Sequence, residues 1–135
     1  KERQFMKPKE YELWFGRVKD NLLWADSAFK DGYFPLVCFL SQQAIELALK
    51  GFCYLKEEIP PKTHDLQLVT KKCEGLGLKI NKKFVSKISI LSGYYLESRY
   101  PDILDEDLNK KETAEEALKF ATEIVNKVKS SLPST

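Results

Sequence analysis

DGYFPLVCFLSQQAIELALKG, residues 31–51, is the stretch that decides the fold. Small residues recur in it at steps of three and four, the spacing of one helical face, at Val37, Ser41, Ala44, Ala48 and Gly51. Such a stripe lets a second helix approach closely, and bulkier leucines widen the apolar surface at Leu36, Leu40 and Leu47. The pattern predicts a central helix over residues 33–56. Pro60 and Pro61 are expected to end it, because consecutive prolines remove backbone donors.

A long amphipathic helix is predicted before this stretch. It covers residues 8–30, and its apolar face carries Tyr11, Trp14, Phe15, Val18, Leu22, Ala25 and Phe29. Gly32 supplies the stop, because glycine takes the left-handed conformation without steric cost. Leu23 and Trp24 lie off the apolar face, so they predict either a homodimer surface or a helix that is packed on all sides.

Three further helices are predicted downstream. A short one covers residues 65–74, with Thr63 or Asp65 as its cap, and ends at a glycine-containing break. Asn81 caps the next, which ends before Pro101 and places Arg99 at its C-terminal end. The last begins at the capping box of residues 113–116 and presents Ala117, Ala121, Ile124 and Val128 on one stripe before Pro133.

The predicted fold class is all-α, an antiparallel up-and-down bundle of four to five helices. No segment alternates apolar and polar residues as a strand does. A chain of 135 residues with 43% hydrophobic and 31% charged residues fits one folded domain. We expect residues 1–7 to be a flexible N-terminus and residues 8–132 to form that single domain.

Composition also narrows the cellular setting. No apolar run approaches the roughly 18 residues that a membrane span needs, and no apolar signal core follows the lysine-rich N-terminus. We therefore expect a cytoplasmic protein with no membrane association. Cys38, Cys53 and Cys73 are odd in number and widely spaced, so buried thiols are expected rather than a disulfide framework or a metal site. A net charge of +2 argues against binding duplex nucleic acid by charge alone.

Lysines gather in the second half of the chain, and they allow two interpretations. They are Lys71, Lys72, Lys79, Lys82, Lys83 and Lys87. Such a run either follows a phosphate backbone or forms an ordinary solvated face. The second interpretation is the commoner one.

Three short motifs occur in an order that resembles one known family. Gln43-Ala44-x-Glu46-x-x-x-Lys50 lies in the central helix, Thr63-His64-Asp65-Leu66 follows it, and Arg99-Tyr100-Pro101-Asp102 ends the fourth helix. Together they resemble the HEPN domain family. The resemblance implies a four- or five-helix bundle, homodimers, and association with nucleotides or RNA. It also implies partnership with small nucleotidyltransferases in two-gene, toxin–antitoxin-like modules, and RNase activity in many branches.

Catalytic HEPN members are similar to one another in an Arg followed, after four to six residues, by a His. A neutral His takes the proton of a ribose 2′-OH, while Arg stabilises charge on the phosphate. Here the residues four to seven positions after Arg99 are Ile103, Leu104, Asp105 and Glu106, so this histidine is absent, and the chain's one histidine is His64. We therefore expect a non-catalytic protein, without cofactor or metal, that binds nucleotide or single-stranded RNA phosphate. Its candidate site residues are Arg99, Glu46, Lys50, Gln43, Tyr100 and Asp102.

Each candidate also has a plainer interpretation. Arg99 binds phosphate through its fork of donors or forms an ion pair with an acid such as Glu46. Glu46 and Lys50 face a cleft together with Gln42 and Gln43, or form a surface pair contributing roughly 0.3 to 0.5 kcal/mol. His64 and Asp65 form an acid/base pair or, as we favour, simply start a helix. A metal-independent endoribonuclease with Asp102 or His64 as base and a purely structural interaction module remain the alternative functions.

Overall fold

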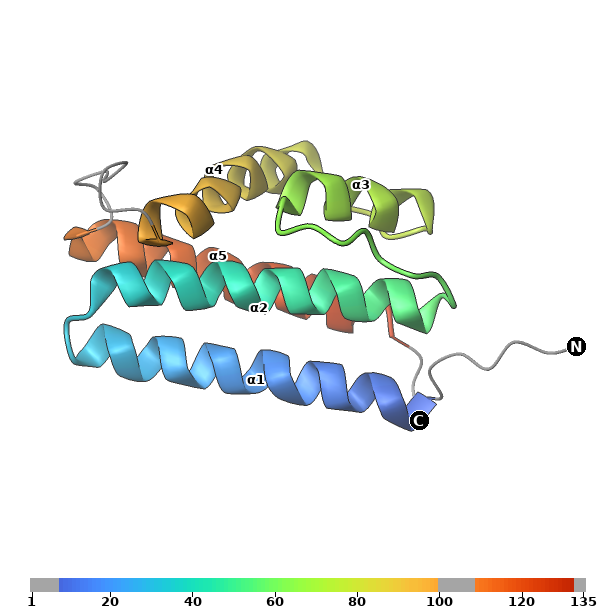
Figure 1. Ribbon diagram of the computed structural model, residues 1–135, viewed down its shortest axis with the longest axis horizontal. Coiled ribbons are helices and arrows are strands. Elements are labelled where there is room, and N and C mark those ends of the chain that lie inside the picture. The colour runs from blue at the N-terminus through green and yellow to red at the C-terminus, as the bar shows by residue number, and fades with distance from the viewer. Residues whose placement is uncertain (1–7, 100–108, 133–135) are drawn as a thin grey trace, which may run out of the picture.

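Five helices make up the part of the chain that the computed structural model describes, residues 8–99 and 109–132, with side chains described at 11–91 and 109–132. They are α1 (Pro8–Lys30), α2 (Phe34–Leu55), α3 (Leu66–Gly75), α4 (Lys82–Arg99) and α5 (Lys111–Lys129). Successive long helices run in opposite directions, and the short α3 lies beside α4 (Figure 1). The predicted all-α up-and-down bundle is confirmed. The predicted flexible residues 1–7 lie outside the described part.

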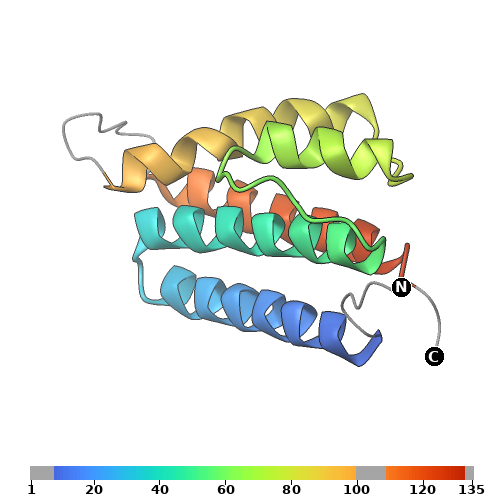
Figure 2. The ribbon, with the colours of Figure 1, turned by 45° about the vertical axis from the view of Figure 1, so that its right-hand side comes forward.

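α2 is the central helix, as predicted. It lies between α1 on one side and α3 and α4 on the other, with α5 packed along it (Figure 1; Figure 2). The predicted stripe of small residues allows a close approach: a Cβ added at Gly51 would meet the Phe15 ring at 3.2 Å and Trp14 Cβ at 3.3 Å. α2 is long and apolar enough to cross a membrane by length and composition, with a mean hydropathy of 1.2. However, 72% of that window is buried in the bundle, which identifies α2 as a core helix.

Three helices end in the same hydrogen-bonded reversal. After α1, the Tyr33 N–H donates to the Ala28 carbonyl at 2.9 Å around Gly32, whose φ is +82°. After α3, the corresponding bond runs around Gly77, φ +106°. After α2, the Glu58 N–H donates to the Cys53 carbonyl at 3.0 Å around Glu57, φ +62°. This is the Schellman arrangement, in which one residue takes the left-handed conformation. The prediction that Pro60 and Pro61 end α2 was therefore wrong, because the reversal at Glu57 comes first.

The helix starts follow local chemistry in two of three predicted cases. The Asp65 side chain accepts a hydrogen bond from the Gln67 N–H at 2.9 Å and caps α3. Asn81 Oδ1 likewise accepts from the Phe84 N–H at 3.0 Å. The capping box predicted at Thr113 was wrong. α5 begins at Lys111 without a side-chain cap bond. There the Lys111 ammonium lies 5.9 Å from the Phe29 ring centroid, a contact between the start of α5 and α1.

The core runs the length of the bundle. Its largest fully buried apolar side chains come from every helix: Val18, Val37, Ile45, Leu49, Phe52, Leu66, Val69, Ile88, Ile124 and Val128. On α1, however, Leu13, Leu23 and Trp24 are 74%, 57% and 52% exposed. The idea that α1 packs on all sides is thereby excluded. An apolar outer face remains on this helix.

Candidate functional site

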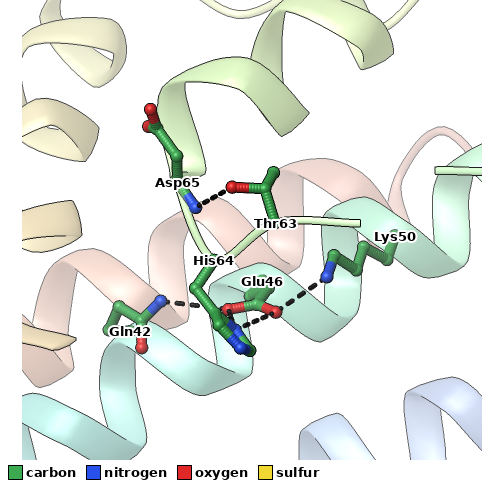
Figure 3. Close-up of polar contacts among 6 residues, drawn as sticks. All are labelled: Gln42, Glu46, Lys50, Thr63, His64 and Asp65. Atoms are coloured by element: carbon green, nitrogen blue, oxygen red, sulfur yellow. Dashed lines mark hydrogen bonds and ion pairs between the residues drawn. The ribbon is translucent and has the colours of Figure 1, made fainter. Parts of the chain in front are cut away.

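Glu46 is the centre of a polar cluster on α2 (Figure 3). Its carboxylate accepts a hydrogen bond from Gln42 Nε2 at 3.1 Å and pairs with Lys50 Nζ at 2.9 Å. His64 Nδ1 approaches the two carboxylate oxygens at 3.0 and 3.2 Å. Gln42, Glu46 and Lys50 follow one another at steps of four, so α2 places all three on one face. We call Gln42, Glu46, Lys50 and His64 the Glu46 cluster.

The chain between α2 and α3 brings His64 to this face. Thr63 Oγ1 accepts from the Asp65 N–H at 3.0 Å, and Asp65 in turn caps α3. These two hydrogen bonds fix the backbone around His64, and the His64 ring contacts the Glu46 carboxylate (Figure 3). The Thr-His-Asp-Leu motif is therefore a structural unit. It starts a helix and delivers an imidazole to the carboxylate of α2.

Burial separates the members of the cluster. The Glu46 and Lys50 side chains are only 10% and 14% exposed, whereas the His64 side chain is 56% exposed. The interpretation of Glu46 and Lys50 as an ordinary surface pair was wrong. Solvent screens a nearly buried pair less, so removing one partner leaves a costly unpaired charge. The arrangement has a rigid, charge-compensated interior and an imidazole at the surface.

The chemistry of the cluster follows from its donors and acceptors. A lysine ammonium carries three N–H donors. Among the described residues, the bond of Lys50 to Glu46 uses one of them. A carboxylate beside Nδ1 orients the imidazole ring and favours the proton on Nδ1, so that Nε2 becomes the acceptor nitrogen. The cluster can thus present cationic donors to an anion. It can also present a basic ring nitrogen to a proton donor.

Gln43 lies apart from this cluster. Its Nε2 donates to Asn21 Oδ1 at 2.9 Å, and Asn21 Nδ2 donates to the Arg17 carbonyl at 2.8 Å. Asn21 is fully buried; the bond from Gln43 ties α2 to α1, and the two bonds together satisfy a polar group in the interface. Of the two adjacent glutamines, Gln42 faces the cluster and Gln43 faces α1.

The remaining predicted site residues come from the end of α4. Arg99 is the last residue of α4, as predicted. Its side chain, like Tyr100 and Asp102, lies outside the described part of the chain. Their place in the site remains a prediction.

A groove lies between α3 and α4, and Asp65, the residue after His64, is part of its lining. It has a volume of about 380 Å³ and is lined by Asp65, Gln67, Leu68, Thr70, Lys71, Glu74, Val85 and Ile88. The hydroxyl of Thr70 is buried there and has no hydrogen-bond partner among the described residues. A buried polar group without a partner indicates a place where water or a ligand can bind. In the same described ranges, no group of three or more potential metal ligands occurs.

Sequence reasoning underrated His64. The favoured role of residues 63–66 was to start a helix, with an acid/base pair of His64 and Asp65 as the alternative, and they do start a helix. The contact of His64 with Glu46 needed the tertiary structure, because 18 residues separate the two. The available signal was the recurrence of the Thr-His-Asp-Leu motif beside the central-helix motif in the family that the chain resembles.

Comparison with known proteins agrees with this architecture. The family model described as the HEPN domain matches residues 11–131. The solved structure of TT1696 from Thermus thermophilus is 26% identical, with a TM-score of 0.81 over 89% of this chain and 96% of that one. The structure of ST0689, described as an archaeal HEPN homologue, is 28% identical, with a TM-score of 0.71 over 91% and 98% of the two chains. No curated protein matches the chain significantly.

Proposed function

The chain belongs to the HEPN domain family, and from this premise we propose that it binds the phosphate groups of a nucleotide or of single-stranded RNA without cutting them. The observation that carries the proposal is the Glu46 cluster, in which one carboxylate holds an ammonium and an imidazole within 2.9 and 3.0 Å. Both groups donate to phosphate oxygens when protonated. The groove between α3 and α4 leaves room for the rest of the ligand.

Each residue has a distinct part in this site. Lys50 keeps its bond to Glu46 and offers its other N–H groups to a phosphate oxygen. Arg99 supplies a planar pair of donors from the end of α4, and Tyr100 stacks on the base. Glu46 keeps the cations in place and compensates their charge when no ligand is bound.

Binding without cutting follows from what comes after Arg99. The histidine that catalytic relatives place four to six residues later is replaced by Leu104, Asp105 or Glu106. Carboxylates near a phosphate repel it and are weak bases at neutral pH. The site therefore lacks the usual acceptor for the ribose 2′-OH proton.

The test is binding of a short fluorescent single-stranded RNA and of ATP, measured by anisotropy and calorimetry at several salt concentrations. Replacing Lys50 or Arg99 by Ala is expected to weaken binding and to reduce the salt slope by about 1 for each lost phosphate contact. Lys119, on α5 away from the cluster, gives the matched control Lys119→Ala. Equal losses in Lys50→Ala and Lys119→Ala would show non-specific charge attraction and would refute the site.

A protein partner completes the proposed function. We place the chain in the cytoplasm, as a homodimer that works with a small nucleotidyltransferase in a two-gene, toxin–antitoxin-like module. The exposed apolar face of α1, with Leu13, Leu23 and Trp24, supports an interface. Analytical ultracentrifugation at tens of micromolar tests the dimer, and Trp24→Glu is expected to give a monomer. A wild-type monomer at that concentration contradicts the homodimer, and failure to co-purify with a co-expressed nucleotidyltransferase contradicts the second partner.

One observation favours a second function, that of a metal-independent endoribonuclease. Glu46 beside His64 Nδ1 gives the carboxylate–imidazole arrangement of a general base. In this reaction His64 Nε2 removes the 2′-OH proton, the 2′-oxygen attacks the phosphorus, the P–O5′ bond breaks, and the leaving 5′-oxygen takes up a proton from water. Lys50 and Arg99 stabilise the charge on the phosphate oxygens. This route replaces the missing histidine of α4 by one from another segment.

An RNA-cleavage assay with EDTA separates the two functions. Cutting that is lost in both His64→Ala and Arg99→Ala, with the fold intact by circular dichroism, establishes the nuclease with His64 as base. Binding without cutting by the wild-type chain supports the first proposal. If the wild-type chain neither binds nor cuts RNA, the structural interaction module is the function that remains. In that case the cluster only ties α2 to the chain that leads into α3.

A further inference from the structure

Two buried cysteines meet between α2 and α3, outside the Glu46 cluster. Cys53 Sγ on α2 lies 3.7 Å from Cys73 Sγ on α3, and both side chains are 0% exposed. Cys73 Sγ also lies 3.1 Å from the Leu49 carbonyl, to which its S–H donates. The third cysteine, Cys38, is also a buried thiol. The first two therefore form a dithiol pair, and Cys38 is an internal reference.

We propose that Cys53 and Cys73 are a redox modification site, which a low-molecular-weight disulfide converts into a disulfide bond between α2 and α3. The two sulfur atoms are already in contact. A bond of about 2.05 Å requires rotation of side chains and a small approach of the two helices. The sequence separation of 20 residues excludes a local CxxC motif, so only the tertiary structure reveals the pair.

The two thiols are unequal, as a reacting pair requires. When Cys53 is ionised, its sulfur accepts the Cys73 S–H in place of the Leu49 carbonyl; this hydrogen bond lowers the pKa of Cys53, against the effect of burial, and the nearby Lys72 ammonium lowers it further. The hydrogen bond with Cys53 and burial both raise the pKa of Cys73. Cys53 is thus the attacking thiolate and Cys73 the resolving thiol.

The reaction balances with glutathione disulfide as oxidant. The Cys53 thiolate attacks one sulfur of glutathione disulfide, the S–S bond breaks, and one glutathione thiolate leaves and takes up a proton. Cys73 then loses its proton to water and attacks the Cys53 sulfur, and the second glutathione leaves as a thiolate that is protonated in turn. The protein loses two electrons and two protons, and one glutathione disulfide becomes two thiols.

Access to the buried pair depends on α3. This helix has 10 residues, fewer than an isolated helix needs to be stable in water, so its packing holds it in place. Its own Leu66 and Val69 side chains are fully buried against the core, while its Lys72 forms a partly exposed ion pair with Glu58 at 3.2 Å. Local opening of such a short element exposes the thiols without global unfolding. The oxidant reacts in the open state, and closing brings the second thiol to the first.

Oxidation has a consequence for the Glu46 cluster. Cys53 lies one turn beyond Lys50 on α2, and the chain between the two cysteines contains His64. A disulfide closes this segment into a loop and restricts the motion of His64 away from Glu46.

The test uses the full chain in glutathione buffers of increasing oxidised fraction, with acid quenching, alkylation of remaining thiols and mass spectrometry of the intact protein and its peptides. The wild-type chain and Cys38→Ser are both expected to lose two hydrogen atoms through a bond between Cys53 and Cys73. Cys73→Ser is expected to stop at a single glutathione adduct on Cys53. A disulfide that includes Cys38, or an accumulated glutathione adduct on the wild-type chain, would overturn the proposal.

A second pair of variants tests the role of α3 and keeps the test independent of cysteine substitutions. Val69→Ala removes buried packing under α3 and is expected to speed oxidation several-fold. Leu68→Ala, on the same helix but 52% exposed, is expected to leave the rate nearly unchanged. Equal rates in both variants, or retention of all three thiols in Val69→Ala, would refute the mechanism.

Discussion

Replacing Glu57 by glycine is expected to stabilise the protein. Glu57 has a φ of +62° in the reversal that ends α2, while the equivalent positions after α1 and α3 are Gly32 and Gly77. The left-handed conformation costs an L-residue about 1 to 2 kcal/mol, and glycine avoids this cost. Glycine also gives the unfolded chain more freedom, which costs about 0.4 to 1 kcal/mol. The net expected gain is about 0.5 to 1 kcal/mol.

Unfolding in urea, followed by circular dichroism, measures this gain. The midpoint is expected to rise with an unchanged slope, because the surface exposed on unfolding stays the same. For a chain of this size, the melting temperature should rise by roughly 2 to 4 °C. The matched control is Glu57→Ala, which removes the carboxylate but keeps a Cβ in the left-handed conformation.

The control separates backbone strain from charge. Glu57 is exposed and forms no ion pair among the described residues, so Glu57→Ala should stay within about 0.5 kcal/mol of the wild type. Equal stabilisation by Ala and Gly would show that charge is the cause. A glycine variant less stable than the alanine variant would refute the argument from φ.

Three further predictions concern packing, capping and the Glu46 cluster. Gly51→Ala is expected to lower the free energy of unfolding in urea by about 1 kcal/mol, because the new Cβ meets Trp14 Cβ at 3.3 Å, an atom fixed to its backbone that cannot rotate away. The control Gly16→Ala, with nothing within 4 Å of the new Cβ, should raise it by up to about 1 kcal/mol. Equal effects of the two substitutions would contradict the close approach. Asp65→Ala should cost about 1 kcal/mol by loss of the α3 cap and speed amide exchange in α3 first, so unchanged exchange there would reject the cap. Glu46→Ala should lower the free energy of unfolding by about 3 kcal/mol, because the nearly buried Lys50 loses its partner. A double-mutant cycle with Lys50→Ala should show a coupling energy above about 1 kcal/mol, and additive effects would mean that the pair is not coupled.

Prediction from sequence succeeded where the signal is local and repeated. The apolar steps predicted α1, Pro8 and Gly32 gave its ends at residues 8 and 30, and the second apolar run gave the ends of α2 to within one residue. Residue type alone predicted Asn81 as a cap and narrowed the cap of α3 to Thr63 or Asp65, of which Asp65 is the cap. The starting point of α5 was missed, and the stop of α2 was assigned to the wrong cause, Pro60 and Pro61. Both depend on contacts or backbone conformations that residue type does not specify.

Prediction of the site succeeded in part, for a related reason. Helical spacing alone places Gln42, Glu46 and Lys50 on one face, so their contacts follow from the sequence. It cannot tell whether that face is buried, and the alternative of a surface pair was open until burial was known. Gln43 shows the same limit. Only the position of α1 decides that this side chain bonds to Asn21.

The sequence by itself determined the helices, their order and the family, because helical periodicity, caps and short motifs are written within a few residues of one another. The tertiary structure alone decided which distant groups meet. It brought His64 to Glu46 across 18 residues and Cys53 to Cys73 across 20. The physical reason is that contact between helices depends on how the whole bundle packs, on the close approach at Gly51 and on the path of the chain from α2 to α3. No local pattern encodes those distances.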